Sequence, residues 1–328
     1  MNEDIVAVIG VLNVARTIGG CLDALTAQPC DIVIVDGGST DGTLEIIEKY
    51  RYRVQLISKP GNLSVARDEA IRQTTHEYIA MTDGDTVVSD HWLEELLGGF
   101  APGIGGVGGP SEVPTDTLVD QTLACIPVHG PSRREVPIWG PPKYERPFVA
   151  KGVYTVAGRC AMYRRAALET VGGFDERAWW ADDSELNQRL IDGGYSLAYE
   201  PKATVKHEHP ETFGSFFRHQ AHYAAGQAIA GRINKRARRR RHPVPLVAFC
   251  SFFALLGGGI FWRWLLYPVL AFLVAVLSAS LAYGIKCARW KRNWRLVLTV
   301  PVGMGLWQLA WVFGYPWGLM ANYGKLGR

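Results

Sequence analysis

Residues 77–85 read EYIAMTDGD, an apolar run that ends in two aspartates separated by a single glycine. The run up to Met81 is typical of a strand buried in a parallel sheet, because it is apolar on both faces. Asp83 and Asp85 follow the strand directly, with Gly84 between them. Two carboxylates this close form a compact set of oxygen ligands, which suits Mg²⁺ or Mn²⁺ bridged to a diphosphate. Short acidic triplets are also common in turns, so this motif alone does not decide the function.

Strand-like and helix-like segments alternate through the residues that precede this motif. The expected strands are 5–11, 31–35, 54–57 and 77–81, and the expected helices are 17–27, 40–50 and 63–73. Repeated strand–helix units predict a parallel α/β sheet with right-handed crossovers. Ligands of such sheets bind beyond the carboxyl ends of the strands, so polar residues at those ends are the candidates for a site.

The second expected strand also ends in acids, within DGGSTDG at residues 36–42. Aspartate is a good turn and helix N-cap residue, so a purely structural role for Asp36 and Asp41 is as plausible as a ligand-binding one.

Two further clusters carry groups that could do chemistry. The segment 179–186 reads WWADDSEL and precedes a helix that runs to about Ile191. Acids at a helix start stabilise the helix dipole, but a carboxylate there could also act as a general base. His207 and His209 end a strand-like segment as HxH. Metal ligation and an ordinary surface position are both open for these histidines.

The composition changes sharply along the 328 residues, although the net charge is only +4. The sequence is mixed and globular up to about residue 211, almost purely basic from Arg232 to Arg241, and mostly apolar from Pro243. We therefore expect a catalytic domain over 1–211, an amphipathic interfacial helix and basic segment over 212–242, and a transmembrane domain over 243–328. Six scattered cysteines without a CxxC pair fit a reducing compartment, and no amino-terminal signal peptide is expected.

Three uncharged stretches at 243–262, 264–285 and 296–320 are each about as long as a membrane-spanning helix. Basic residues cluster before the first stretch and again between the second and third, whereas Arg263 separates the first two. The positive-inside rule then predicts an integral membrane protein with its amino-terminal domain in the cytoplasm. The arginine run beside a span suits anionic lipid headgroups better than nucleic acid, so no nucleic-acid partner is expected.

The order of these motifs resembles the family 2 glycosyltransferases, the inverting group with a GT-A fold, over about residues 4–230. The motifs that carry the resemblance are 36–43 (DGGSTDGT), 66–68 (ARD), 83–85 (DGD), 172–176 (GGFDE) and 182–186 (DDSEL). The apolar carboxyl-terminal stretches make the chain similar to the membrane branch with polyprenyl-phosphate mannose synthases and, more distantly, cellulose-synthase-like enzymes. The resemblance implies a Rossmann-like α/β nucleotide-sugar domain, followed by the interfacial helix and three transmembrane helices.

The resemblance also implies a role for individual residues. Asp183 would be the catalytic base. The nucleotide-sugar side of the site would be formed by Asp36, Arg67, Asp83, Gly84, Asp182 and Gln220, where Asp182 replaces the usual glutamate of the family. A divalent cation, Mn²⁺ or Mg²⁺, would be held by Asp85, with Asp83 and His207 contributing and His209 as the weaker choice.

Gln220 falls where cellulose-synthase-like members carry Gln-x-x-Arg-Trp, but here the sequence continues Ala221-His222-Tyr223, which weakens the prediction of a processive, polymer-forming enzyme. Gly158 and Arg159 are expected by analogy to line the acceptor site.

The expected reaction is transfer of a sugar from a nucleotide sugar, with GDP-mannose first and UDP-sugars next, to a polyprenyl phosphate or a lipid-linked glycan. A nucleotidyltransferase could use similar acidic turns, but residues 12–20, LNVARTIGG, make a poor phosphate loop. A catalytically inactive membrane scaffold is the third possibility, and the presence of Asp83, Asp85 and Asp183 together argues against it.

Overall fold

A seven-stranded sheet forms the centre of the amino-terminal half in a computed structural model of the chain. The structure describes residues 4–112, 116–126, 156–207, 212–237 and 242–321. The strands of this sheet are β1 (Ile5–Val11), β2 (Asp31–Asp36), β3 (Val54–Ser58), β4 (Tyr78–Asp83), β6 (Ile104–Gly108), β8 (Ala161–Arg164) and β9 (Ser196–Tyr199). Their order is β3-β2-β1-β4-β8-β6-β9. The first four are parallel, as predicted, whereas β8 runs antiparallel to both neighbours.

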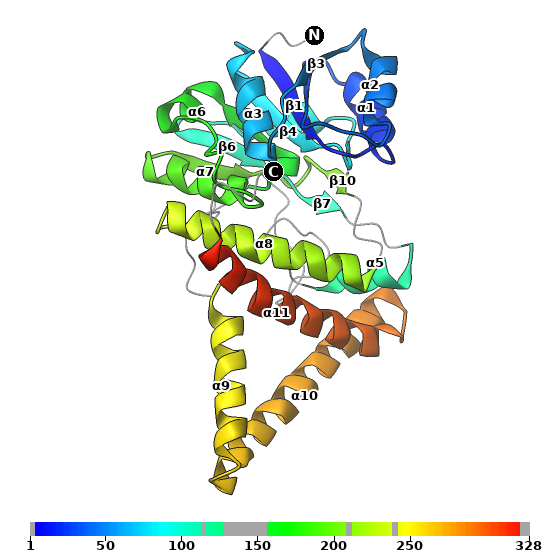
Figure 1. Ribbon diagram of the computed structural model, residues 1–328. Coiled ribbons are helices and arrows are strands. Elements are labelled where there is room, and N and C mark those ends of the chain that lie inside the picture. The colour runs from blue at the N-terminus through cyan, green and yellow to red at the C-terminus, as the bar shows by residue number, and fades with distance from the viewer. Residues whose placement is uncertain (1–3, 113–115, 127–155, 208–211, 238–241, 322–328) are drawn as a thin grey trace.

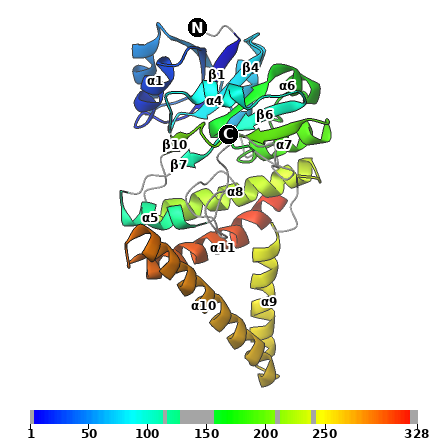
Figure 2. The same cartoon turned by 180° about the vertical axis from the view of Figure 1, so that it is seen from behind.

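Helices cover both faces of this sheet (Figures 1 and 2). They are α1 (Ile18–Thr26), α2 (Thr43–Ile47), α3 (Leu63–Arg72), α4 (Trp92–Gly98), α6 (Arg165–Val171) and α7 (Asp182–Asp192), with 3-10 turns η1 (Glu48–Tyr50) and η2 (Gly158–Cys160). Successive residues of a strand point to opposite faces, so Ile9 packs in one buried cluster with Leu22, and Val8 packs in another with Leu168. A continuous apolar strand such as β1 is therefore what a sheet covered on both sides requires.

A second, three-stranded sheet lies at the carboxyl end of β4 and has the order β5-β10-β7. Its strands are β5 (Thr86–Val88), β7 (Ser111–Glu112) and β10 (Val205–His207). Because β10 pairs antiparallel to β5, His207 lies opposite Thr86, one residue after Asp85. This small sheet brings the carboxyl-terminal end of the α/β half back to the DGD turn.

Three helices form a layer beneath the α/β half: α5 (Leu118–Cys125), α8 (Phe213–Ile233) and α11 (Leu296–Met320). α8 is the helix expected within the segment 212–242, but α11 covers one of its sides, so it does not lie alone at a surface. Small residues allow this contact, because a Cβ added at Gly314 would lie 2.1 Å from the carbonyl oxygen of Ala221, and one at Gly318 would lie 2.2 Å from that of Ala225. α5, from within the expected catalytic domain, also packs on α11, where Thr122 and Thr299 hydroxyls lie 2.7 Å apart.

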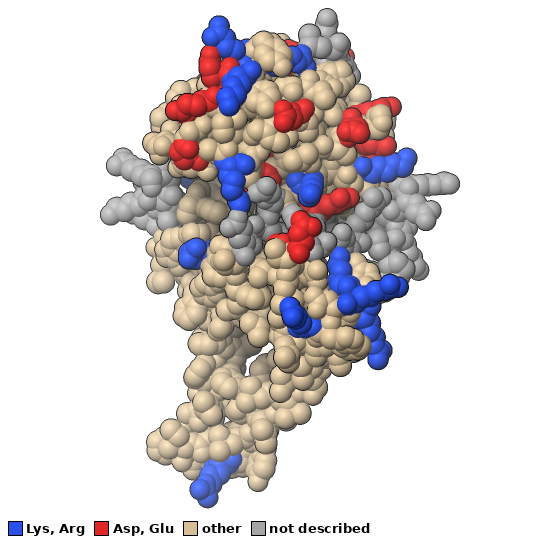
Figure 3. All heavy atoms as spheres, turned by 90° about the vertical axis from the view of Figure 1, so that its right-hand side faces the viewer, with Lys and Arg blue, Asp and Glu red and all other residues tan. Residues whose placement is uncertain are grey.

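A helical hairpin, α9 (Val244–Gly258) and α10 (Leu266–Lys291), projects from this layer (Figure 1). The short turn η3 (Arg263–Leu265) lies at its tip. Figure 3 shows that the surface of this projection is almost free of charged side chains except at the tip and at the base. Large apolar side chains such as Leu270 and Leu277 are exposed along it.

Among the described residues, the structure supports two of the three predicted spans. Two helices, α10 with its preceding turn and α11, are long and apolar enough to cross a membrane, by length and composition only. The first expected span forms a helix of 15 residues, because it ends in the glycines that lead to the tip. α11 differs from α10 in that 33% of its most apolar window is buried in the protein, against 6% for α10.

Candidate active site

The register of the main sheet places two of the predicted acids at one edge. Within the parallel strands, Val11 pairs with Asp36 and Gly10 pairs with Asp83. Asp36 and Asp83 therefore flank the carboxyl end of β1, about 10 Å apart across two strand spacings. This is the edge at which a parallel α/β sheet binds its ligands.

Asp36 uses its carboxylate within its own turn. Its oxygens accept hydrogen bonds from the backbone N–H groups of Gly38 at 2.9 Å and Ser39 at 3.1 Å, and the residue is only 2% exposed. The structural role considered for this aspartate is therefore present, and a role with the nucleotide stays a prediction.

Arg67, on α3, is 2% exposed and joins two of the predicted acids. Its guanidinium lies 2.9 Å from Asp83 Oδ1 and 2.6 Å from Asp182 Oδ2. Burial by itself would lower the pKa of Arg67, but the charges of Asp182 and Asp83 raise it. Gly158 packs against this guanidinium, since a Cβ there would lie 2.7 Å from it. Both terminal nitrogens of Arg67 are thus occupied by protein carboxylates, which makes it an internal cross-link between the DGD turn and α7.

Asp85 and His207 form the second pair of the site. His207 Nε2 lies 3.3 Å from Asp85 Oδ2, and the Asp85 side chain remains 40% exposed. Burial contributes a rise to the pKa of Asp85, but the hydrogen bond and charge of His207 lower it overall. Asp85 Oδ1 is buried and has no hydrogen-bond partner among the described residues. His207 thus lies beside Asp85, and its role as a metal ligand stays a prediction, whereas His209 lies outside the described residues.

Asp85 and His207 offer only part of a metal's ligands, which suits a cation whose remaining ligands come from the substrate. Within the described parts of the chain, no cluster of three or more His, Cys, Asp or Glu side chains is arranged to hold a metal by itself. Mg²⁺ and similar cations commonly use one or two protein carboxylates together with substrate phosphates and water. The buried, unpartnered oxygen of Asp85 is a ligand of the type such an ion needs. Gly84, between the two acids, packs closely on Val14, and its carbonyl oxygen accepts a hydrogen bond from Thr17 at 2.8 Å.

Asp183 is the second residue of α7 and is held by backbone donors. Its carboxylate accepts hydrogen bonds from Ser184 N at 2.6 Å and Gly158 N at 3.4 Å. Burial and the neighbouring charge of Asp182 raise the pKa of Asp183 to about 6. A carboxylate poised near neutrality and oriented by backbone groups has the properties of a general base.

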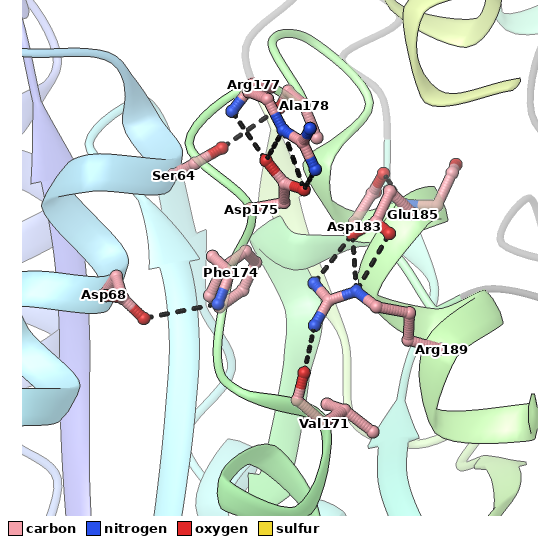
Figure 4. Close-up of polar contacts among 11 residues, drawn as sticks. Ser64, Asp68, Val171, Phe174, Asp175, Arg177, Ala178, Asp183, Glu185 and Arg189 are labelled. Carbon is pink, nitrogen blue, oxygen red and sulfur yellow. Dashed lines mark hydrogen bonds and ion pairs between the residues drawn. The ribbon is translucent and has the colours of Figure 1, made fainter. Parts of the chain in front are cut away.

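The loop that leads into α7 is anchored from several sides (Figure 4). Arg189 forms a bidentate ion pair with Glu185, at 2.7–2.9 Å, and donates to the carbonyl of Val171 at 2.6 Å. Asp68, on α3, accepts from the backbone N–H of Phe174 at 3.3 Å. These contacts fix the start of α7 relative to α3, and so fix Asp183 relative to Arg67.

Aromatic side chains beside Asp183 are the feature that sequence reasoning left unassigned. Trp180 adopts a left-handed φ of 63° and stacks on His222 of α8, with ring centroids 5.0 Å apart. Trp179 and Trp317 pack around the same imidazole, and the His219 ring lies edge-on to Trp180, with centroids 5.2 Å apart. The adjacent tryptophans at 179 and 180 were the available signal. Gln220 is 2% exposed, and its Oε1 has no hydrogen-bond partner in the part of the chain that the structure describes.

Comparison with known proteins decides the family. The model of the family described as "Glycosyl transferase family 2" matches residues 6–172, and that of "Glycosyl transferase family group 2" matches residues 147–285. The chain belongs to glycosyl transferase family 2. This confirms the resemblance on which the sequence-based prediction rests. Glycosyl transfer is therefore the reaction against which the acidic edge of this family 2 glycosyltransferase is interpreted.

Curated relatives carry several glycosyl-transfer names. A "Pre-mycofactocin glycosyltransferase" of Mycobacterium tuberculosis is 26% identical over 94% of this chain and 63% of its own length. A "Poly-beta-1,6-N-acetyl-D-glucosamine synthase" of Staphylococcus epidermidis is 26% identical over 60% of this chain and 47% of its own length. The chain therefore spans less than two thirds of the length of these relatives.

Solved structures share the fold. The mannosyltransferase PcManGT from Pyrobaculum calidifontis, in complex with GDP-Man and Mn²⁺, superposes with a TM-score of 0.60 at 19% identity, covering 97% of this chain and 88% of that one. S. aureus TarS 1–349 in complex with UDP-GlcNAc superposes with a TM-score of 0.51 at 16% identity, covering 92% and 91%. The GT-A architecture of this family 2 glycosyltransferase is thus common to enzymes solved with different donors.

Proposed function

We propose that this family 2 glycosyltransferase is a membrane-anchored, divalent-cation-dependent enzyme that inverts the sugar it transfers from a nucleotide sugar to a lipid-linked acceptor. One observation carries the proposal: four side chains suited to this chemistry lie together at one edge of the sheet, namely Asp83, Asp85, Asp183 and His207. Arg67 connects the DGD turn to α7.

The reaction follows from the state of these side chains. With a glycan acceptor, Asp183, when ionised, takes the proton of the acceptor hydroxyl as that oxygen attacks the sugar's anomeric carbon from the face opposite the diphosphate. With a polyprenyl phosphate acceptor the attacking oxygen is already anionic, and Asp183 would instead orient it or bind the metal. The bond to the diphosphate breaks, and the configuration at that carbon inverts. Asp182 is held by Arg67, so it supports Asp183 electrostatically and is not itself free to take the proton.

Asp85 and His207 are the residues that would hold Mn²⁺ or Mg²⁺, with Asp83 adjacent. When bound, the cation supplies positive charge that stabilises the leaving diphosphate. The resemblance assigns the nucleotide to the side of the site formed by Asp36 and the DGD turn. GDP-mannose is the first donor to test and UDP-GlcNAc the second, since GT-A enzymes of similar fold were solved with each.

The acceptor and the membrane belong to the same proposal. The α9–α10 hairpin has the exposed apolar surface that a bilayer would cover, and Trp262, Arg263 and Trp264 at its tip suit the far interface. Basic residues of the described chain, such as Lys235 and Arg289, flank the hairpin on the catalytic side. This asymmetry favours a cytoplasmic catalytic domain that meets a polyprenyl phosphate or lipid-linked glycan at the membrane surface.

The deciding experiment is sugar transfer or donor hydrolysis by detergent-purified protein across UDP- and GDP-sugars, with lipid extract as the acceptor. It is run with Mn²⁺, with Mg²⁺ and with chelator, beside Asp85→Ala and Asp183→Asn. We expect one donor to be used only with metal and to be lost in both variants. Absence of turnover with every donor, together with absence of metal-dependent nucleotide binding, would overturn the proposal.

A further inference from the structure

Two arginines lie at the active edge, and their surroundings differ. The terminal nitrogens of Arg67 are taken up by Asp83 and Asp182. Arg159, in contrast, makes one side-chain hydrogen bond, from its Nε to Ser111 Oγ at 3.0 Å. Among the described residues its terminal guanidinium nitrogens have no hydrogen-bond or ion-pair partner, and the side chain is only half-buried. An arginine that is oriented but not paired is available to a ligand.

The backbone fixes where this arginine stands. Arg159 lies in η2, immediately before β8, and its carbonyl oxygen accepts a hydrogen bond from Thr82 at the end of β4. The preceding residue, Gly158, donates to Asp183. The Nε bond to Ser111 directs the side chain to β7, in the small sheet that also carries His207. Arg159 therefore stands between the DGD turn, the start of α7 and the His207 strand.

Electrostatics agree with this central position. Burial acts to raise the pKa values of Asp83, Asp85 and Asp183, and the positive charge of Arg159 is among the effects that lower them at all three. No carboxylate of the described chain is close enough to pair with it. A guanidinium surrounded by acids that it does not bind stabilises the site while keeping its donors for an incoming anion.

We propose that Arg159 binds a phosphate oxygen at the reaction centre through its terminal guanidinium nitrogens. The inference rests on the proposed function. It goes beyond the expectation that Arg159 lines the acceptor site, because it names the atoms that bind and the phosphate group that they bind. The same chemistry serves two sources, the diphosphate of the donor or the phosphate of a polyprenyl phosphate acceptor. Arginine suits either, because its planar fork matches two phosphate oxygens at once.

The test uses the full chain in detergent with Arg159→Gln and Arg159→Lys. Its matched control is Arg164→Gln, at the opposite end of β8, where Arg164 pairs with the exposed Glu77. Calorimetric titration with UDP, UMP, GDP and GMP in the presence of Mn²⁺ measures affinity for the donor nucleotide. The KM for undecaprenyl phosphate, compared with the KM for a neutral methyl glycoside, measures recognition of the acceptor phosphate. The unfolding temperature of every variant shows whether it is folded.

If the ligand is the donor diphosphate, Arg159→Gln weakens nucleoside diphosphate binding about 10- to 100-fold and leaves monophosphate binding unchanged. If it is the acceptor phosphate, nucleotide binding is unchanged and the KM for undecaprenyl phosphate rises by a similar factor, whereas the KM for the glycoside does not. Arg159→Lys restores part of either loss, because lysine keeps the charge but not the fork.

Unchanged values for both ligand classes would overturn the inference and leave the proposed function intact. An equal loss of mono- and diphosphate binding together with a lower unfolding temperature would also overturn it, since that pattern marks a structural role. If the unaltered protein bound none of these nucleotides with Mn²⁺ and transferred no sugar, the proposed function itself would fail.

Discussion

Arg67 and Asp182 form an ion pair of 2.6 Å although 115 positions separate them in the chain. The pair is almost inaccessible to solvent, with side chains 2% and 9% exposed. It joins α3, which packs under the parallel strands, to the first residue of α7. Arg67 also pairs with Asp83, so one guanidinium holds carboxylates at both ends of the site.

Arg67→Met is expected to lower the free energy of unfolding by about 3–5 kcal/mol, because removing one partner leaves the other buried charges uncompensated. Chemical denaturation in detergent measures the loss. Arg72→Met is the control on the same helix, where the 53% exposed arginine pairs at the surface and is expected to contribute about 0–1 kcal/mol. Equal losses in the two variants would contradict the cross-link.

Asp183→Asn is expected to reduce kcat by about 10²- to 10⁴-fold while nucleotide binding persists. Its raised pKa of about 6 also sets the sign of the pH dependence. The base must be ionised, so kcat/KM is expected to be high above pH 6 and to fall about tenfold per pH unit well below it. A pH–rate profile measures this, with Asp192→Asn at the other end of α7 as the control. An acidic limb that persists in a residually active Asp183→Asn variant would assign the titration to another group.

Much of this arrangement could be predicted from sequence, because it depends on patterns among neighbouring residues. Continuous apolar runs identify buried parallel strands, and acids that follow them must lie at the ligand-binding edge. For this reason Ile5–Val11 is predicted without error, and Asp83, Asp85 and Asp183 are found on one side of the fold. The helix over 296–320 is likewise predicted to the residue, since nothing but uncharged side chains occurs there.

The remaining features depend on contacts between distant segments, which local patterns do not record. The ion pairs of Arg67 with Asp83 and Asp182 are not predicted, because no local pattern near position 67 indicates a contact with Asp182. The place of Arg67 near the nucleotide stays a prediction. The approach of His207 to Asp85 depends on the pairing of two three-residue strands. The burial of α11 depends on glycines that match alanines of α8, and hydropathy alone does not distinguish such a helix from one surrounded by lipid.

Replacing either His207 or Asp85 is expected to remove metal-dependent nucleotide binding. Mn²⁺ binding by His207→Ala and Asp85→Asn, followed by electron paramagnetic resonance with and without UDP or GDP, measures this without requiring turnover. We expect at least a tenfold weaker Mn²⁺ affinity in each, since each variant loses a ligand. His91→Ala is the control, because this exposed histidine pairs with Glu94 at the surface. Undiminished Mn²⁺ affinity in both site variants would place the cation elsewhere.

The hairpin prediction concerns lipid contact. Val274→Arg combined with Leu277→Arg places two charges on exposed positions in the middle of α10, each expected to cost about 2.5–3.5 kcal/mol of membrane insertion. We expect the double variant to become extractable by alkaline carbonate, as measured by fractionation. Tyr52→Arg combined with Leu56→Arg, at exposed apolar positions of the α/β half, is expected to leave fractionation unchanged. Full retention of the α10 variant in the membrane would argue that this face does not contact lipid.

Gly314→Ala tests whether the α8–α11 contact positions the active site. The added Cβ would lie 2.1 Å from Ala221 O, so the helices must separate, at a cost of about 1–3 kcal/mol. α8 in turn packs its Gly226 against the backbone of Trp179 and Trp180, where a Cβ would lie 2.6 Å from the Trp179 carbonyl oxygen.

We therefore expect Gly314→Ala to lower both the unfolding temperature and kcat, with nucleotide affinity preserved. Gly305→Ala on the same helix is the matched control, since a Cβ there meets nothing within 4 Å and alanine favours a helix by about 1 kcal/mol over glycine. Because both changes add one methyl group to α11, a difference between them isolates the close packing. Equal kcat in the two variants would show that the position of Asp183 is independent of α11.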